Sequence, residues 1–282
     1  MTDTIQNIRG RAVPMLGLGT YKLTGQACRE GVAHALTMGY RHIDTAQMYK
    51  NEADVGAGIA DAPVAREDVF LTTKVWHTNL SPEDVRRSTE ESLQRLDTDY
   101  VDLLLIHWPA HLDGDHDALR STLDAFVALH EAGHVRHIGV SNFSIRLLNQ
   151  TVDHLPAEAP LFAHQAEYHP FLAQEAVLRH AREHDYLFTA YSPLAQGDAL
   201  RNDTLQSIGD RHGKTAAQVT LRWLLQQPQV SAIPKAGGAS HRIANLDVFD
   251  FALSDYEMTA IHNLARAERR IDPAFAPAWS TT

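Results

Sequence analysis

Short apolar runs alternate along this chain with longer amphipathic stretches of helical periodicity, and this alternation limits the fold more than any other feature. It is the pattern of β-α units, whose strands pair in parallel within one sheet. No long linker, low-complexity tract or internal repeat interrupts it. The sequence therefore predicts an α/β fold, a (β/α)8 TIM barrel formed by a single domain over residues 1–282. The predicted strands are residues 15–18, 41–44, 69–74, 101–107, 135–140, 162–165, 186–190 and 230–233.

Two local signals add elements outside the eightfold pattern. Residues 4–8 and 12–13 flank an Arg9-Gly10 turn and predict a β-hairpin, which we expect to cover the floor of the barrel. Near the other end of the chain, Ser254 and Glu257 have the spacing of a capping box. We therefore expect a late helix to begin after Ser254.

Polar groups that are seldom buried without a partner end three of the predicted strands. Asp44 ends the second strand, Lys74 the third and His107 the fourth. Tyr49 follows Asp44 in the next loop. Reactive groups at the carboxyl ends of barrel strands are usually catalytic. From the residues alone an alternative stays open, in which Asp44 and Lys74 form a structural ion pair and Tyr49 anchors its loop.

The chain resembles the aldo-keto reductase family over most of its length. The resemblance rests on short segments that occur in the family's order and at its spacing. The compact length is most similar to that of the bacterial 2,5-diketo-D-gluconate reductase type. The segments are residues 16–21, 39–56, 71–76, 99–109, 139–143, 165–170, 192–194 and 233–235.

The resemblance implies that the protein reduces aldehydes or ketones to alcohols by hydride transfer, with Tyr49 as the proton donor. Lys74 would lower the pKa of Tyr49 and Asp44 would bind Lys74, while His107 would orient the substrate. A free tyrosine, with a pKa of ~10, is a poor donor at neutral pH. A lysine cation ~4 Å away contributes about 4 kcal/mol at an effective dielectric constant of ~20. We therefore expect Lys74 to bring the pKa of Tyr49 toward neutrality.

The resemblance also implies a nicotinamide cofactor, NADPH, that extends across the barrel mouth, with NADH as a second candidate. In agreement, the sequence lacks the Gly-x-Gly-x-x-Gly fingerprint of Rossmann folds. The residues placed at the substrate are Tyr21, Trp76, His107 and Trp108, and Trp279 is a candidate lid. Those placed at the cofactor are Gly19, Thr20, Tyr21, Asp44, Ser141, Asn142, Gln165, Tyr191, Ser192, Leu194, Gln196, Lys235, Ala236, Gly237, Arg242 and Asn245.

A few positions depart from the family's pattern. The family often has Asn where this chain has His164. The Lys that binds the 2′-phosphate of NADPH is usually followed by Ser or Thr, but here Ala236 follows Lys235, and Arg242 comes one place later than usual. Both cations remain, and the N-terminus of the following helix favours an anion. We therefore expect a preference for NADPH over NADH.

Composition restricts the partners and the compartment. The formal net charge of −10 argues against nonspecific binding to nucleic acid, whose affinity is largely electrostatic. No apolar run approaches the ~20 residues of a membrane span. No signal peptide is found, and the single cysteine, Cys28, cannot form an internal disulfide. We expect a cytoplasmic protein, with the monomer favoured, whose partner is a small carbonyl compound.

The sequence disfavours two other functions for this chain. A regulatory barrel that keeps its cofactor, similar to the potassium-channel β subunits of this family, is disfavoured by the complete set of Asp44, Tyr49, Lys74 and His107. A metal-dependent hydrolase is disfavoured because His42 and Asp44 do not form a His-x-His pair and Lys74 would repel a cation. We also interpret His130, His134 and His137 as a solvated face at the end of one helix. No metal is therefore expected.

Overall fold

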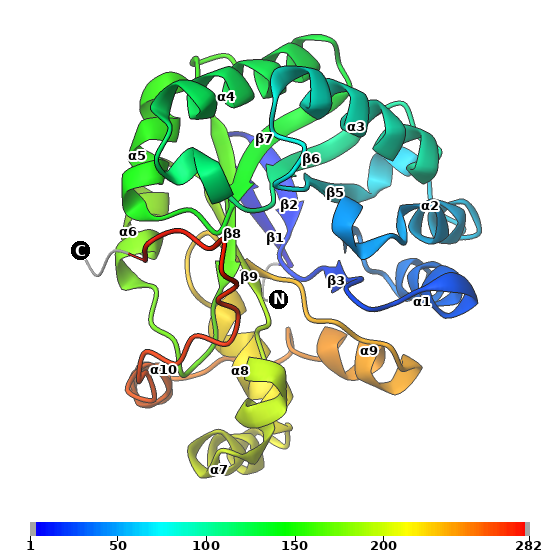
Figure 1. The fold of residues 1–282 in the computed structure, drawn as a ribbon. Helices are drawn as coiled ribbons and strands as arrows, with labels where there is room; N and C mark the ends of the chain where they lie inside the picture. Colours follow the sequence, from blue (N-terminus) through cyan, green and yellow to red (C-terminus); the bar gives the residue numbers. More distant parts are fainter. Residues whose placement is uncertain (1–3, 280–282) are drawn as a thin grey trace.

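The structure is a computed structural model that describes residues 4–279, and it shows a barrel of parallel strands ringed by helices (Figure 1). The strands follow one another around the sheet in chain order, and each neighbouring pair is parallel. The predicted (β/α)8 barrel is confirmed. Its strands are β3 (Leu18–Gly19), β4 (His42–Asp44), β5 (Phe70–Val75), β6 (Val101–Ile106), β7 (Val135–Ser141), β8 (Leu161–Glu167), β9 (Leu187–Tyr191) and β10 (Val230–Ala232).

The barrel closes between its first and last strands through single bridges rather than a continuous ladder. Leu16 bridges Ala232 and Gly19 bridges Lys235, both in parallel. Glycine is required at position 19, because a Cβ there would lie 2.5 Å from the carbonyl oxygen of Ile233. The predicted first strand, residues 15–18, was therefore wrong in extent, since only its last residue belongs to β3. The ends of the other predicted strands agree with the structure to within two residues.

Helices cover the outer face of the barrel and begin at the signals seen in the sequence. The Ser254 hydroxyl accepts from Glu257 N, and this capping box begins the predicted late helix. Within residues 4–279, no helix has both the length and the apolar character needed to cross a membrane. The helices are α1 (Gly25–Thr37), α2 (Glu52–Ala60), α3 (Pro82–Leu96), α4 (His116–Glu131), α5 (Ile145–His154), α6 (Glu175–Glu183), α7 (Asp203–His212), α8 (Ala216–Leu225), α9 (Ala239–Leu246) and α10 (Asp255–His262).

A β-hairpin precedes the barrel, as predicted. Its strands are β1 (Ile5–Ile8) and β2 (Arg11–Pro14), which pair in antiparallel register. The turn between them has positive φ angles at Arg9 (48°) and Gly10 (79°). The hairpin side chains Ile8 and Val13 are fully buried in a cluster with residues of β5, β6, β8 and β9. The hairpin therefore shares one apolar core with the barrel strands.

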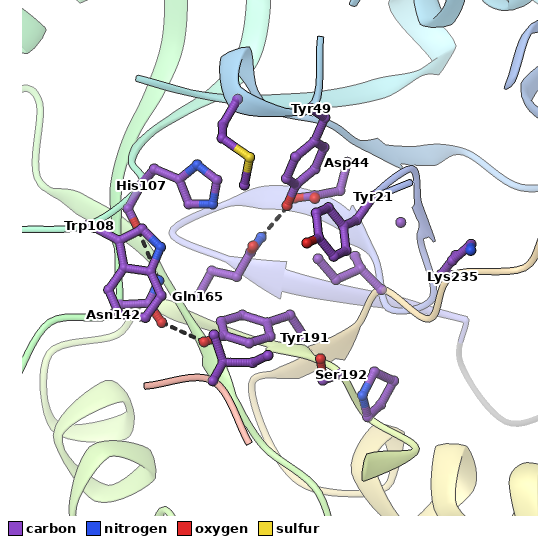
Figure 2. Close-up of a pocket in the computed structure, with 15 residues that line it drawn as sticks. Tyr21, Asp44, Tyr49, His107, Trp108, Asn142, Gln165, Tyr191, Ser192 and Lys235 are labelled. Atoms are coloured by element: carbon purple, nitrogen blue, oxygen red, sulfur yellow. Dashed lines mark hydrogen bonds between the residues drawn. The ribbon is translucent and has the colours of Figure 1, made fainter. Parts of the chain in front are cut away.

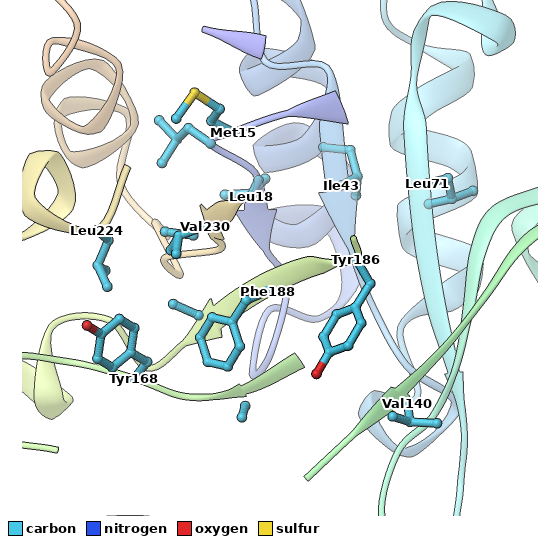
Figure 3. Close-up of a cluster of buried hydrophobic side chains, with 14 of the residues drawn as sticks. Met15, Leu18, Ile43, Leu71, Val140, Tyr168, Tyr186, Phe188, Leu224 and Val230 are labelled. Carbon is cyan, nitrogen blue, oxygen red and sulfur yellow. The ribbon is translucent and has the colours of Figure 1, made fainter. Parts of the chain in front are cut away.

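A larger apolar core fills the space between the strands and the surrounding helices (Figure 3). Phe188 of β9, Val230 of β10 and Leu224 of α8 are all fully buried within it. Burying a side chain of this size stabilises the fold by roughly 1.5–3 kcal/mol relative to leaving it in water. This packing fixes the strand ends from which the polar residues of the barrel mouth project.

Gly139 of β7 generates a prediction about packing in the sheet. A Cβ at this position would lie 2.5 Å from Leu105 Cδ2 and 2.6 Å from the carbonyl oxygen of Ala163. We expect Gly139→Ala to lower the free energy of unfolding by about 1–3 kcal/mol, the usual cost of overpacking, as measured by urea denaturation. Gly114→Ala is the matched control, because nothing lies within 4 Å of the added atom. Equal stability of the two variants would contradict this account.

Candidate active site

A buried ion pair between Asp44 and Lys74 lies at the carboxyl end of the barrel strands. Lys74 Nζ donates to Asp44 Oδ1 at 2.5 Å and to the carbonyl oxygen of Thr45 at 2.8 Å. Its third hydrogen bond goes to the phenol oxygen of Tyr49 at 3.3 Å. The side chains of Lys74 and Asp44 are 0% and 1% exposed. The ammonium group therefore has a partner for each of its three protons.

The strand ends bring these residues together. Asp44 is the last residue of β4, and Lys74 lies in the neighbouring strand β5. Tyr49 ends a short 3-10 helix, η1 (Gln47–Tyr49), that follows β4. Residues close in the sequence thus supply the acid and the phenol, and strand pairing supplies the amine.

The side chain of Asn51 attaches the turn after Tyr49 to the barrel through hydrogen bonds. Its side-chain nitrogen donates to the carbonyl oxygens of Thr20 at 2.9 Å and Leu23 at 2.8 Å. Its side-chain oxygen accepts from the Thr45 hydroxyl at 2.8 Å. Asn51 is 1% exposed, so these bonds satisfy a buried amide. The turn between Tyr49 and α2 is therefore hydrogen-bonded to the segments that follow β3 and β4.

The ion pair lies at a cavity of about 190 Å³ at the barrel mouth (Figure 2). The rings of Tyr49 and His107, which follows β6, meet edge to face with centroids 5.7 Å apart. In Figure 2, Tyr49, His107 and Gln165 are directed toward the same space. The predicted residues that line the cavity are Gly19, Tyr21, Asp44, Tyr49, His107, Trp108, Asn142, Gln165, Tyr191, Ser192 and Lys235.

Amide side chains join the opposite wall to the ion pair. Gln165 Nε2 donates to Asp44 Oδ2 at 2.7 Å. Asn142 donates to the carbonyl oxygen of His107 at 2.9 Å and accepts from the Tyr191 hydroxyl at 2.7 Å. The backbone of Asn142 is left-handed, with φ of 63°, a conformation that asparagine tolerates better than most residues. The ends of β6, β7 and β9 are thus linked to one another, and the end of β8 is linked to that of β4.

Burial sets the protonation states at the cavity. Burial, the charge of Asp44 and the nearby tyrosines raise the pKa of Tyr49 well above its ordinary value. Burial lowers the pKa of Lys74, and the bond to Asp44 opposes this shift. Burial and the charge of Lys74 lower the pKa of His107 well below its ordinary value. The expectation that Lys74 brings the pKa of Tyr49 toward neutrality was therefore wrong for the resting protein, in which the phenol stays protonated.

Other residues predicted at the cofactor or substrate lie outside the cavity lining. The Thr20 hydroxyl donates to the carbonyl oxygen of Asp44 at 2.9 Å, and the Ser141 hydroxyl accepts from Asn142 at 3.0 Å. Trp76 packs edge-on against His107, with ring centroids 5.1 Å apart. In the segments that follow β9 and β10 lie Leu194, Gln196, Ala236, Gly237, Arg242 and Asn245.

Arg242 is directed into the protein. Its Nη1 donates to the carbonyl oxygens of Ala236 at 2.9 Å and Gly237 at 3.0 Å, and its Nε donates to His34 Nδ1 at 3.2 Å. Arg242 is 6% exposed, whereas Lys235 is exposed and lines the cavity. Arg242 therefore braces the loop that carries Lys235, a role that sequence analysis did not predict.

Four residues that line the cavity were not predicted from the sequence. Met48, Pro193 and Ile233 are neighbours of residues that were predicted, so their position in the family-like segments was a usable signal. Ile271 comes from the C-terminal tail, and no motif marks it. The tail reaches the cavity only through tertiary contacts.

The histidines of α4 and β7 do not form a metal site. Residues 130–134 read His-Glu-Ala-Gly-His, a spacing that binds zinc when both histidines lie on one helix. Here α4 ends at Glu131, so His130 lies in the helix and His134 lies beyond its end. The prediction that His130, His134 and His137 form one solvated helix face was also wrong. His137 lies in β7, and its ring stacks on that of Phe162 with centroids 3.9 Å apart. Within residues 4–279, no group of three or more His, Cys, Asp or Glu side chains is arranged to bind a metal ion.

The arrangement suits proton transfer to a group held in the cavity. Tyr49 carries the proton, and Lys74 is already bonded to the oxygen that becomes negative when the proton leaves. A neutral His107 can donate a hydrogen bond to that group without adding a second positive charge beside Lys74. Amide groups, the Tyr191 ring and the exposed Lys235 line the same cavity, which fits an aromatic amide that carries an anionic extension.

His164, which replaces the family's Asn, generates a pH prediction. Phe143 N donates to its Nε2 at 3.2 Å, and burial lowers the pKa of His164 to about 3. An unfolded histidine titrates near ~6.5, so between these pH values the unfolded chain binds a proton that the folded chain does not. Stability should therefore fall as the pH drops below ~6.5, by up to about 1.4 kcal/mol per pH unit.

We expect His164→Asn to reduce this slope in urea unfolding experiments between about pH 5 and pH 7. His116→Asn, at an exposed position of α4, is the matched control. If the two variants showed the same slope as the parent protein, the buried imidazole would not be the source of the acid sensitivity.

Comparison with known proteins agrees with this geometry. Residues 15–266 match the model of the "Aldo/keto reductase family". The glyoxal reductase of Bacillus subtilis is 40% identical over 270 residues, which cover 95% of each chain. The methylglyoxal reductase DkgB of Yersinia pestis is 38% identical over 269 residues, which cover 95% of this chain and 99% of the relative.

Solved structures give the same result. A crystal structure provisionally named 2,5-diketo-D-gluconic acid reductase B has a TM-score of 0.94 and 41% identity, covering 100% of this chain and 98% of the other. An aldo/keto reductase from Brucella melitensis has a TM-score of 0.87 and 37% identity, covering 94% and 99%. The chain belongs to the aldo-keto reductase family and is an NAD(P)H-dependent oxidoreductase that reduces carbonyl groups.

Proposed function

We propose that this protein reduces small carbonyl compounds, α-dicarbonyls among them, with NADPH, and that Tyr49 supplies the proton. The observation that carries the proposal is the continuous set of hydrogen bonds from Asp44 through Lys74 to Tyr49 at the cavity. The names of the relatives, glyoxal reductase and methylglyoxal reductase, support a small dicarbonyl as substrate. The cavity of about 190 Å³ has room for such a compound beside a nicotinamide ring.

The chemistry divides between the cofactor and the chain. Reduced nicotinamide, when bound, supplies a hydride to the carbonyl carbon. Negative charge then develops on the carbonyl oxygen, and Tyr49 releases its phenolic proton to that oxygen. The resulting phenolate accepts a hydrogen bond from Lys74, whose charge Asp44 stabilises at 2.5 Å. Because these groups are in place before the reaction, little reorganisation opposes the proton transfer.

The other walls of the cavity orient the reactants. Neutral His107 donates a hydrogen bond to the carbonyl oxygen and holds it near Tyr49. The amides of Asn142 and Gln165 would bind the nicotinamide carboxamide, with the Ser141 hydroxyl beside them. The Tyr191 ring would stack on the nicotinamide. Two aromatic side chains, those of Tyr21 and Trp108, would enclose the substrate and exclude water.

The comparisons do not support the alternative of a regulatory barrel, since the named relatives are reductases. We further propose that residues 1–282 form one domain, that the protein works as a monomer, and that it acts in the cytoplasm. The buried, unpaired thiol of Cys28 is compatible with that compartment.

Tyr49→Phe tests the proton donor. The substitution removes one hydroxyl group and keeps the ring, so we expect the dissociation constant for NADPH to stay near the parental value. Turnover of methylglyoxal should fall by at least ~10²-fold, the usual scale for loss of a positioned acid. Tyr256→Phe, at a residue that is 81% exposed, is the matched control. If the turnover of Tyr49→Phe stayed within tenfold of the parental value, Tyr49 would not be the proton donor.

Cofactor selection depends on the loop after β10. Because Arg242 is engaged by loop carbonyls, Lys235 is the cation offered at the cavity. One charge-assisted contact contributes ~1.5–3 kcal/mol, so kcat/KM should favour NADPH over NADH by roughly ten- to a hundredfold. Lys235→Ala should remove most of this preference, because it weakens the binding of NADPH and leaves that of NADH unchanged.

Arg242→Ala should give a contrasting result. Without the hydrogen bonds from Arg242 the loop should become disordered, and the binding of both NADPH and NADH should weaken. Fluorescence titration with NADPH and NADH measures each dissociation constant. Equal kcat/KM for the two cofactors in the parent enzyme would refute the proposed role of Lys235.

A further inference from the structure

Glu167, the last residue of β8, binds the backbone of the C-terminal tail at the barrel mouth. Its Oε1 and Oε2 accept from Arg270 N at 2.9 Å and 3.0 Å, and Oε2 also accepts from Ile271 N at 3.0 Å. These partners lie more than 100 residues away in the sequence. The Glu167 side chain is 0% exposed. A carboxylate fixed to the barrel thus holds a segment that no strand or helix contains.

His169 completes the environment of this carboxylate. Phe171 N donates to His169 Nδ1 at 3.3 Å, which places the ring proton of the neutral tautomer on Nε2. Nε2 lies 3.1 Å from Glu167 Oε1 and donates to it. The carbonyl oxygen of Phe171 accepts from Arg266 N at 3.2 Å and Glu268 N at 3.1 Å. Glu167 and Phe171 therefore join the end of β8 and the following loop to the tail at four of its residues between positions 266 and 271.

The segment held in this way forms part of the cavity wall. Ile271 lines the cavity together with Tyr191 and Trp108. Further along the tail, the Phe275 ring meets the rings of Trp76 and Trp108 edge to face, with centroids 5.6 Å apart in both pairs. In Figure 1 the tail, coloured red, passes β8 after leaving α10. Glu167 therefore holds the tail at Ile271 and directly before the segment that carries Phe275.

We propose that Glu167 is a positioning residue for substrate selection, which holds Ile271 and Phe275 at a fixed distance from Tyr49 and so limits the size of the carbonyl compound that enters. The proposal rests on the proposed function of the cavity. Backbone N–H groups withdrawn from water need an acceptor, and an ionised carboxylate is a strong one. Without that acceptor, the tail would move away from the cavity and the size limit would relax.

Glu167→Gln tests this, because it keeps the volume and removes the charge and one acceptor oxygen. We expect the ratio of kcat/KM for 4-nitrobenzaldehyde to kcat/KM for methylglyoxal to rise by roughly tenfold, within the range that pocket contacts provide. The kcat for methylglyoxal and the dissociation constant for NADPH should stay near parental values. Glu183→Gln, the same change at an exposed residue of α6, should leave the ratio unchanged.

A double-variant cycle separates positioning from a purely structural role. Ile271→Ala should raise the ratio alone, and Glu167→Gln combined with Ile271→Ala should raise it no further, since both changes open the same wall. Fully additive effects would overturn the proposal. So would a Glu167→Gln variant that is less stable but has the parental ratio.

If Glu167→Gln does not fold, Ile271→Ala and Phe275→Ala decide the question. Parental ratios in both would show that the tail does not select substrates. Tyr49→Phe, assayed with the same two aldehydes, separates the two proposals. Retained turnover in that variant would remove the proposed function, whereas lost turnover with an unchanged ratio in the tail variants would remove only the role of Glu167.

Discussion

The buried pair of Lys74 and Asp44 is the interaction on which the rest of the site depends. Withdrawing two charges from water costs several kcal/mol for each ion, and removal of one partner typically destabilises a protein by ~3–5 kcal/mol. Here the cost is offset by bonds from Lys74 to Thr45 and from Gln165 to Asp44. The first bond joins β5 to the end of β4, and the second crosses the barrel from β8 to β4, so the pair is fully satisfied only when these strands are folded together. The fold and the site are thus stabilised by the same contacts.

The fold could be predicted from sequence because its signals are local. An apolar run followed by an amphipathic stretch identifies each β-α unit, and Ser254 with Glu257 identifies the start of α10. The first strand could not be placed correctly, because its extent depends on a distant neighbour. At that neighbour only single bridges form, and the backbone of Gly19 makes close contact with that of Ile233. That contact joins residues more than 200 positions apart, which periodicity does not reveal.

The site could be predicted in part for the same reason. Asp44, Lys74 and His107 each belong to or follow a strand, so the barrel brings them to one end. The direction of Arg242 was not predictable, because it is set by acceptors on its own loop and by His34, a residue of α1. The tie between Glu167 and Ile271 was equally hidden, since it spans 104 residues. Side chains that act through tertiary contacts leave no local pattern.

The protonation states of the site suit the first step of the proposed reduction. With Lys74 paired to Asp44 and both Tyr49 and His107 neutral, the resting group has no net charge, which suits an uncharged carbonyl substrate. The raised pKa of Tyr49 keeps its proton available at neutral pH. An alkoxide is a stronger base than a phenolate, so transfer of that proton to the product remains favourable. Oxidation of an alcohol would require the phenolate first, and burial together with Asp44 makes that form scarce. The environment that makes Tyr49 a poor free acid therefore keeps Tyr49 in the protonated form that reduction requires. The balance between carbonyl compound and alcohol at equilibrium is set by the reactants and not by this residue.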